Sequence, residues 1–131
     1  MKKLLLTIWE APQKLAALLA KKIFKAEECG EYNGAKLYFW RCEGGMSLSN
    51  HIFLPFNELT GSQWQEEYIK HEYGHTIQSR YLGPFYLLII GIPSLLWAGW
   101  YGIIEKKTKK SYYWFYTESW ADKLGGVKRE D

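Results

Sequence analysis

The sequence predicts a small, mainly helical protein of the α+β class, and three observations lead to this prediction. The chain has 131 residues, which is enough for one compact domain over 1–131 with a modest core. An aromatic-rich stretch with turn signals around it indicates a short β-hairpin at 35–54. Stretches with helical spacing at 62–81 and 111–124 flank a long apolar run, and a further amphipathic stretch occupies 1–25.

The composition excludes several classes of protein. Hydrophobic residues make up 47% of the chain and charged residues 24%, which is typical of a folded domain and not of a disordered one. A net charge of +3 is too small to indicate nucleic-acid binding, so no nucleic-acid partner is expected. The only cysteines are Cys29 and Cys42, which excludes a disulfide scaffold and a four-cysteine zinc site. The sequence leaves their redox state open.

The first 25 residues predict a cationic amphipathic helix. An apolar run at 4–9 is shorter than the core of a secretion signal, and Glu10 and Pro12 end it, so we expect the segment to be retained. Such a helix either lies on an anionic membrane or covers the protein core. Its apolar residues are Leu15, Leu18, Leu19 and Ile23, and its charge comes from Lys14, Lys21, Lys22 and Lys25.

The turn signals place the strands of the predicted hairpin. The Asn33-Gly34 pair precedes a strand at 35–42, and Gly44-Gly45 separates this strand from a second one at 46–54, which Pro55 ends. Downstream, Ser62 can cap the helix at 62–81, and Gly83-Pro84 ends it. The helix at 111–124 ends at Gly125-Gly126, which suits a C-cap.

The helix at 62–81 contains the pattern H-E-x-x-H, formed by His71, Glu72 and His75. Four residues turn a helix by about 400°, so the two histidines share a face and can bind one metal ion. Glu72 is rotated by about 100° from His71, which suits a general base acting on a water molecule. The expected metal is Zn²⁺, which needs a third protein ligand and leaves a fourth position for water.

Glu118 is the preferred third ligand, although the sequence leaves alternatives open. The extended motif with a third histidine is excluded, because Gln78 and Tyr81 occupy its last two conserved positions. Asp122 follows Glu118 by one turn, so it shares a face with Glu118 and can accept a hydrogen bond from a zinc-binding histidine. The alternative third ligands are Glu66, Glu67, Glu105 and His51.

H-E-x-x-H followed by a helix with Glu-x-x-x-Asp resembles the gluzincin group of zinc metallopeptidases. The resemblance covers two helical motifs and implies a zincin-like domain with His71, His75 and Glu118 as ligands and Glu72 as base. It also implies that substrate binds along a sheet-edge strand, for which 46–54 is the candidate. The longer stretch 71–94 looks like a family of small bacterial proteins without an assigned activity. For the group that stabilises the oxyanion, the sequence offers Tyr112, Tyr113, Tyr116 and His51.

The apolar run at 81–104 is long enough to span a bilayer, since about 20 residues suffice. A single span would place His75 and Glu118 on opposite sides of the membrane, where they could not bind one zinc ion. Gly91 and Pro93 offer a break, so we expect a helical hairpin at 84–104 that dips into the membrane and returns. The lysines at positions 106, 107, 109 and 110, together with those of the N-terminal segment, favour the cytoplasmic face of the cell membrane. A hairpin in a soluble core is the alternative.

Together these features predict a membrane-associated zinc metallohydrolase, most simply a peptidase, with a peptide or protein as substrate. Two other interpretations remain open. One is a non-enzymatic membrane protein with a structural or inactive zinc site. The other is a single-span anchor in which the histidines are incidental.

Overall fold

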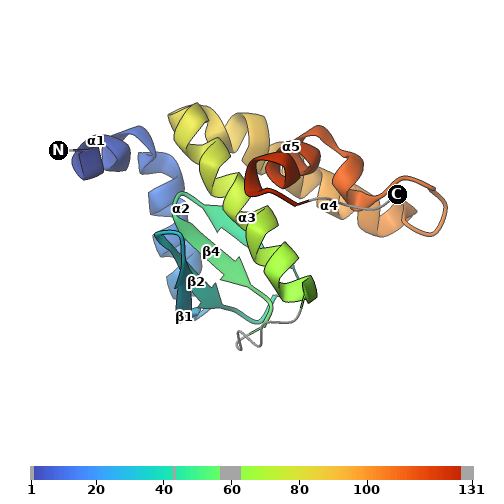
Figure 1. The fold of residues 1–131 in the computed structure, drawn as a ribbon, viewed down its shortest axis with the longest axis horizontal. Helices are drawn as coiled ribbons and strands as arrows, with labels where there is room; N and C mark the ends of the chain where they lie inside the picture. The colour runs from blue at the N-terminus through green and yellow to red at the C-terminus, as the bar shows by residue number, and fades with distance from the viewer. Residues whose placement is uncertain (1, 43, 57–62, 128–131) are drawn as a thin grey trace.

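The computed structural model describes residues 2–42, 44–56 and 63–127, and it has the predicted α+β architecture (Figure 1). Five α-helices accompany one four-stranded mixed sheet in this part of the chain. In chain order the regular elements are α1 (Lys2–Trp9), α2 (Ala11–Ile23), β1 (Glu27–Tyr32), β2 (Ala35–Phe39), β3 (Met46–Leu48), β4 (His51–Leu54), α3 (Gln63–Leu82), α4 (Ile92–Ile104) and α5 (Tyr116–Gly125). Short 3-10 and π-helical turns at Gly83–Phe85, Leu87–Gly91 and Tyr112–Trp114 complete them.

The sheet has the strand order β1-β2-β4-β3. Strands β1 and β2 form an antiparallel hairpin over Asn33 and Gly34, whose positive φ angles of 47° and 86° suit a tight turn between twisted strands. Strand β4 runs parallel to β2, and β3 pairs antiparallel with β4 at the edge of the sheet. Strand β3 is therefore the edge strand nearest to α3 in the part described.

The prediction of a β-hairpin formed by 35–42 and 46–54 is wrong. Residues 46–54 do not form one strand, because the chain turns at Ser49, which has a φ of 57°, and divides the segment into β3 and β4. The Asn33-Gly34 turn places β1 on one edge of β2, and β4 takes the other edge in parallel register. The turn signals marked the strand ends, but local signals do not determine which strands pair over longer distances.

Helices cover both faces of the sheet. Helix α2 lies behind the sheet in the view of Figure 1 and α3 lies in front of it. Alternate residues of the strands point to the two faces and form two clusters. The cluster beneath α2 comprises Ala17, Tyr38, Trp40, Leu48 and Phe53, and the cluster beneath α3 comprises Ala35, Leu37, Ile52, Leu54 and Ile69.

The segment at 1–25 forms two helices with a break at Glu10, where one amphipathic helix was expected. A buried polar cluster fixes this break against the end of α3. The Gln13 side-chain nitrogen donates to Ser79 Oγ at 2.9 Å and to the carbonyl of Gly83 at 2.7 Å, and Ser79 donates to Glu10. The leucines expected on the apolar side of α2 therefore face away from the core, because Gln13 and Ala17 take the buried side.

Helix α3 is the predicted motif helix, and α5 packs directly on it. Ser62, its predicted cap, lies outside the described residues. Helix α5 ends as expected at a C-cap glycine, Gly126, with a left-handed φ of 79°.

The prediction of a helical hairpin at 84–104, with a break at Pro93, is wrong. Leu87–Ile104 forms one helix, long and apolar enough by length and composition to cross a membrane, with 11% of it buried. Pro93 lies in the first turn of α4 after the π-helical turn, and it cannot donate to the carbonyl of Ile89 as another residue there would. Tyr116 Oη donates to that carbonyl at 2.6 Å, which satisfies it.

The chain nevertheless returns along this helix. After α4 it turns, and the segment leading to α5 runs back beside the helix. Trp97 Nε1 donates to the carbonyl of Tyr112 at 2.7 Å, and Tyr101 Oη donates to the carbonyl of Lys110 at 3.1 Å. The return brings α5 back to α3 near the start of the helix Leu87–Ile104, whereas Ile104 lies at the far end of that helix.

Candidate metal centre

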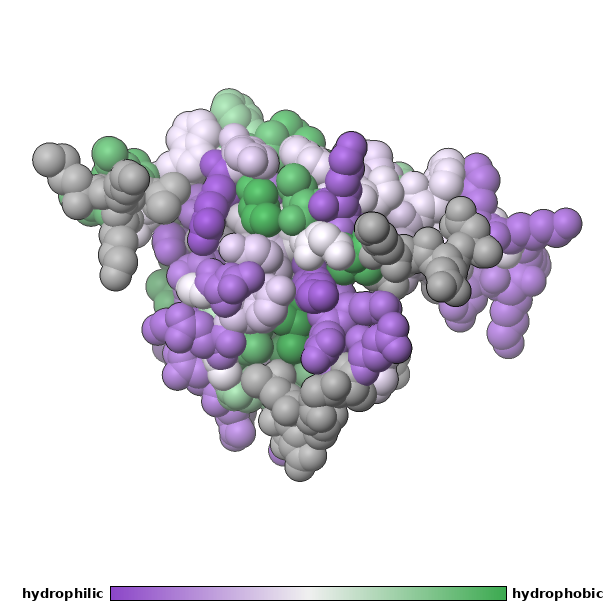
Figure 2. Space-filling view, viewed as in Figure 1, coloured by the Kyte–Doolittle hydropathy of each residue, from purple (hydrophilic) through white to green (hydrophobic). Residues whose placement is uncertain are grey.

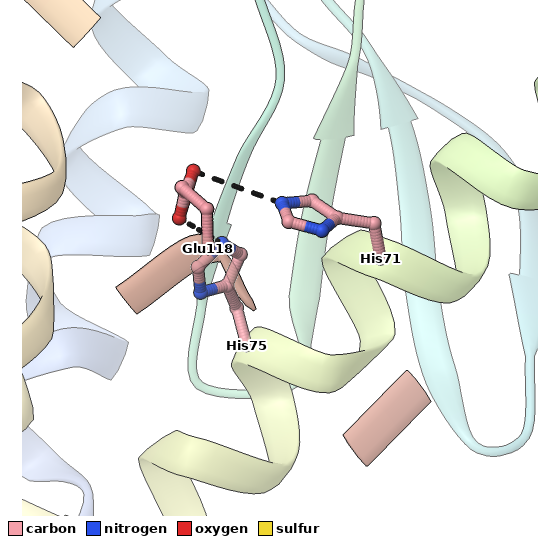
Figure 3. A group of neighbouring side chains, drawn as sticks. All are labelled: His71, His75 and Glu118. Atoms are coloured by element: carbon pink, nitrogen blue, oxygen red, sulfur yellow. Dashed lines mark ion pairs between the residues drawn. The ribbon is translucent and has the colours of Figure 1, made fainter. Parts of the chain in front are cut away.

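Two helices bring the predicted ligands together at a buried point (Figure 3). Helix α3 presents His71 and His75 from successive turns, and α5 presents Glu118 between them. Glu118 Oε2 lies 3.0 Å from His75 Nε2, and Glu118 Oε1 lies 3.7 Å from His71 Nε2. The potential ligand atoms lie within 4.8 Å of one another, so a single ion could contact all of them after small side-chain adjustments.

The donor set fits zinc. His71 Nε2 is buried and has no hydrogen-bond partner among the described residues, which is costly unless an ion binds there. Two imidazoles and one carboxylate are the protein ligands of many catalytic zinc sites. Glu66, Glu67, Glu105 and His51, the alternative third ligands, are not part of this cluster.

Further side chains hold both histidines in the orientation that metal binding requires. Asp122 Oδ1 lies 2.6 Å from His71 Nδ1, as expected from its position one turn after Glu118. Gln78 Oε1 lies 2.7 Å from His75 Nδ1, and Gln78 Nε2 donates to the carbonyl of Thr117 at 3.0 Å. When each Nδ1 donates its proton to these oxygens, each Nε2 is left free as a ligand.

Glu72 lies beside the cluster, and Ser47 on β3 holds it. Ser47 Oγ is 3.0 Å from Glu72 Oε1 and 2.8 Å from the Glu72 carbonyl oxygen. The other carboxylate oxygen, Oε2, lies 3.9 Å from His71 Nε2. Burial raises the pKa of Glu72, whereas the neighbouring histidines oppose this increase. This arrangement suits a general base next to the ion and not a ligand.

Without a metal ion the cluster is an ion-pair network. Burial alone would lower the pKa of His71, but the hydrogen bond with Asp122 and the nearby carboxylate of Glu118 outweigh it and raise this pKa to about 9. Burial opposes ionisation of Glu118 as well, yet its bonds to the two histidines hold its pKa well below the usual value. A metal ion must therefore displace protons from the imidazoles, so its affinity decreases as the pH falls.

The structure separates the candidates for oxyanion stabilisation. Tyr112 borders the cavity beside Glu118, and burial together with this carboxylate raises its pKa. Tyr113 packs edge-on against the His71 ring at 5.0 Å. Tyr116 is 50% exposed and bonds to Ile89, and His51 stacks on Tyr38 at 5.5 Å on the α2 side of the sheet. Tyr116 and His51 are therefore not brought to the site, whereas Tyr112 is.

Three residues that shape the site, Gln78, Ser47 and Tyr86, were not predicted from the sequence as site residues. Gln78 is three residues after His75 on the same helix, so the spacing alone could have indicated it. Ser47 carried no local signal, because its contact with Glu72 depends on where β3 lies relative to α3. The same holds for Tyr86, whose buried hydroxyl donates to the Ser47 carbonyl at 3.1 Å.

A cavity of about 210 Å³ adjoins the cluster. Glu72, His75 and Glu118 form one side of it, and the rest of its wall is largely apolar. The cavity therefore borders the position where an ion would bind. Its other lining residues are Gly45, Met46, Ser47, Leu48, Tyr86, Leu87, Gly91, Ile92, Ser94, Leu95, Ala98 and Tyr112.

Comparison of the chain with protein-family models, curated proteins and solved structures finds no match. The resemblance to gluzincins therefore stays a prediction from the two helical motifs of the sequence.

Proposed function

We propose that this protein is a zinc-dependent hydrolase, specifically a peptidase. The observation that carries the proposal is the joint placement of His71, His75 and Glu118 with the carboxylate of Glu72, at the wall of a cavity. Structural zinc sites have four protein ligands and are closed. A cluster with three ligands beside a cavity favours catalysis over a structural role.

The proposed chemistry divides between the ion and the chain. Zinc lowers the pKa of a water molecule that it binds to about 7 and polarises a carbonyl group. Glu72 would accept the proton of the attacking water and later deliver it to the leaving amine. Ser47 would hold Glu72 in place, and Tyr112 is the candidate hydrogen-bond donor to the developing oxyanion.

Strand β3 is the candidate surface for the peptide backbone. It lies at the edge of the described sheet, and its residues Met46, Ser47 and Leu48 line the cavity. An extended peptide can add to such an edge through main-chain hydrogen bonds. The resemblance to gluzincins implied this role for 46–54, and the structure supports it only for the shorter strand Met46–Leu48.

The test is Glu72→Gln, which removes the base while keeping the shape of the side chain. We expect the variant to bind one zinc ion as the wild type does and to lose cleavage of a mixed peptide library by at least about a hundredfold. Glu67→Gln, on the same helix but outside the cluster, is the matched control and should retain cleavage. Equal cleavage by wild type and Glu72→Gln would favour the non-enzymatic interpretation.

We also propose that the protein associates with the surface of a membrane. Large apolar side chains are exposed on α1, α2 and the helix Leu87–Ile104, and a soluble domain would normally bury them. The turn Gly83–Phe85 contacts α2, so the chain enters this helix from beside α2. The exposed residues on these two elements include Leu15, Leu18, Leu19, Ile23, Leu88, Ile92, Leu95 and Leu96.

Lysines accompany these apolar faces, which suits anionic lipids and the cytoplasmic leaflet. Lys21, Lys22 and Lys25 are exposed on and after α2, and 106–110 forms a lysine-rich turn at the far end of α4, seen as the hydrophilic right-hand end in Figure 2. Because these charges lie at the tip, we infer that α4 lies along the surface and does not insert end-on.

Vesicle co-sedimentation tests the association. We expect the protein to bind vesicles containing phosphatidylserine more tightly than neutral ones, and the exposed-face pair Leu15→Ser and Leu19→Ser to reduce binding about tenfold or more. Equal recovery in the supernatant with and without vesicles would contradict the proposal.

A further inference from the structure

Much of the cavity wall comes from the apolar helix. Gly91, Leu95 and Ala98 line it from successive turns of one helical face. Met46 and Leu48 face them from β3, and Tyr86 and Leu87 contribute further apolar surface. The cavity is therefore a cleft between the sheet edge and the helix Leu87–Ile104, with the ligand cluster at one side.

The size and chemistry of the cleft indicate what it can hold. Its volume of about 210 Å³ exceeds the roughly 150 Å³ of an engineered cavity that binds benzene. The charged groups that line it, namely Glu72, His75 and Glu118, belong to the candidate metal centre. A large aliphatic or aromatic side chain therefore fits the space, and a charged one would lose its hydration without a partner there.

The mouth of the cleft opens beside the exposed apolar face of the same helix. Ile92 and Leu95 line the cleft and are also 49% and 59% exposed. Leu88 and Leu96, which do not line the cleft, continue the exposed face on either side. A chain segment that lies against this face would therefore contact residues that also line the cleft beside the metal centre.

We propose that the cleft binds a large apolar side chain next to the scissile bond of the substrate, and that the substrate is an apolar peptide segment resident in the membrane that enters over the exposed face of α4. This inference rests on the proposed function, since it requires both the zinc site and the membrane surface. It adds the class of substrate and the direction of entry.

Calorimetry with two small chelators tests the cleft without using catalysis. The probes are the hydroxamates of acetic acid and of 4-methylpentanoic acid, which share the zinc-binding group and differ in the apolar chain. We expect the longer hydroxamate to bind the zinc-loaded wild type at least about tenfold more tightly. Leu95→Trp should abolish this difference by filling the cleft, whereas the neighbouring Leu96→Trp, outside the cleft, should retain it.

Photo-cross-linking tests the direction of entry. Benzoylphenylalanine replaces Leu96 in one variant and Trp64, exposed on α3 away from the cleft, in the control. The target is a leucine-rich, lysine-flanked peptide in vesicles containing phosphatidylserine. We expect cross-linking from position 96 and not from position 64, and we expect the 4-methylpentanoic hydroxamate to reduce it several-fold by occupying the cleft.

The outcomes distinguish this inference from the proposed function. Equal affinity of the wild type for the two hydroxamates would overturn the apolar cleft while leaving the zinc hydrolase intact. Entry over α4 would be overturned if the longer hydroxamate bound tightly but position 96 gave no cross-linking. It would also be overturned if the hydroxamate did not reduce the cross-linking. A wild-type protein that binds no zinc would refute the proposed function and this inference with it.

Discussion

Gly74 on α3 lies so close to Ala121 on α5 that a Cβ atom on the glycine would be 1.9 Å from the Ala121 carbonyl oxygen. The two helices can approach to this distance only because position 74 has no side chain. Gly125 makes a second such approach, because its Cβ would lie 1.9 Å from the Lys70 carbonyl oxygen. The contact sets the spacing between the motif helix and Glu118, and the metal centre depends on it.

Gly74→Ala should therefore push α5 away from α3. We expect the free energy of unfolding to fall by about 1–3 kcal/mol, as for other overpacked cores, and zinc affinity to fall because Glu118 moves away from the histidines. Urea unfolding and competition with a zinc chelator measure the two effects.

Gly99→Ala is the matched control, since it also replaces a helical glycine and a Cβ there meets nothing within 4 Å. It should leave zinc affinity unchanged and leave stability equal or raise it by up to about 1 kcal/mol. If Gly74→Ala behaved like Gly99→Ala, the close packing of α3 on α5 would be refuted.

Removing a group that orients a histidine should weaken zinc binding without abolishing it. Asp122→Ala takes away the partner of His71 Nδ1, and Gln78→Ala takes away that of His75 Nδ1. We expect each to reduce zinc affinity about 10–100-fold. Chelator competition measures the change, with the exposed Ser119→Ala on α5 as the control. If both variants bound zinc with wild-type affinity, these two contacts would not contribute to zinc binding.

Much of this centre could be predicted from the sequence, because its spacing is local. Helical periodicity predicts that His71 and His75 share one face and that Glu118 and Asp122 share another, and the resemblance to gluzincins implied that the two pairs meet. The strand pairing could not be predicted in this way, since the turn at Ser49 divides a segment that reads as one strand.

The predicted hairpin in the long apolar run was wrong for a related reason. Pro93 suggested a break, but a π-helical turn and a hydroxyl from Tyr116 accommodate it. The chain still returns to α3, though as a loop with a short 3-10 helix at Tyr112–Trp114 and not as a second long helix. The contact of Ser47 with Glu72 and that of Tyr86 with the Ser47 carbonyl also depend on tertiary packing, so no local sequence pattern predicts them.

Two tyrosine substitutions should have different effects on peptide cleavage. Tyr112→Phe removes the hydroxyl that borders the cavity, and we expect kcat to fall about tenfold to a hundredfold with zinc retained. Tyr116→Phe removes only the bond to the Ile89 carbonyl, so it should cost about 1 kcal/mol of stability and leave kcat unchanged. Steady-state kinetics and thermal unfolding compare them. The reverse pattern would place Tyr116, and not Tyr112, at the substrate.

His51 should make stability depend on pH in a predictable direction. Burial, with nearby lysines adding to it, lowers the pKa of His51 to about 4, so the unfolded chain binds its proton more readily than the folded one. The free energy of unfolding should therefore decrease as the pH falls from about 6.5 to about 4. Over this pH range, the free energy of unfolding of His51→Gln should decrease by about 1 kcal/mol less than that of the wild type, after allowance for solvent screening. Parallel pH profiles for the two proteins would contradict this.

The zinc content of the purified protein is the most direct test of whether His71, His75 and Glu118 bind a zinc ion. Mass spectrometry of metal content would be applied to the wild type, His71→Ala and Glu118→Ala, each prepared in mild detergent, with circular dichroism to show that the variants fold. We predict one zinc ion per chain in the wild type and the loss or strong weakening of zinc binding in both variants. A wild type that takes up no zinc after reconstitution, or a Glu118→Ala variant that binds zinc as well as the wild type does, would contradict it.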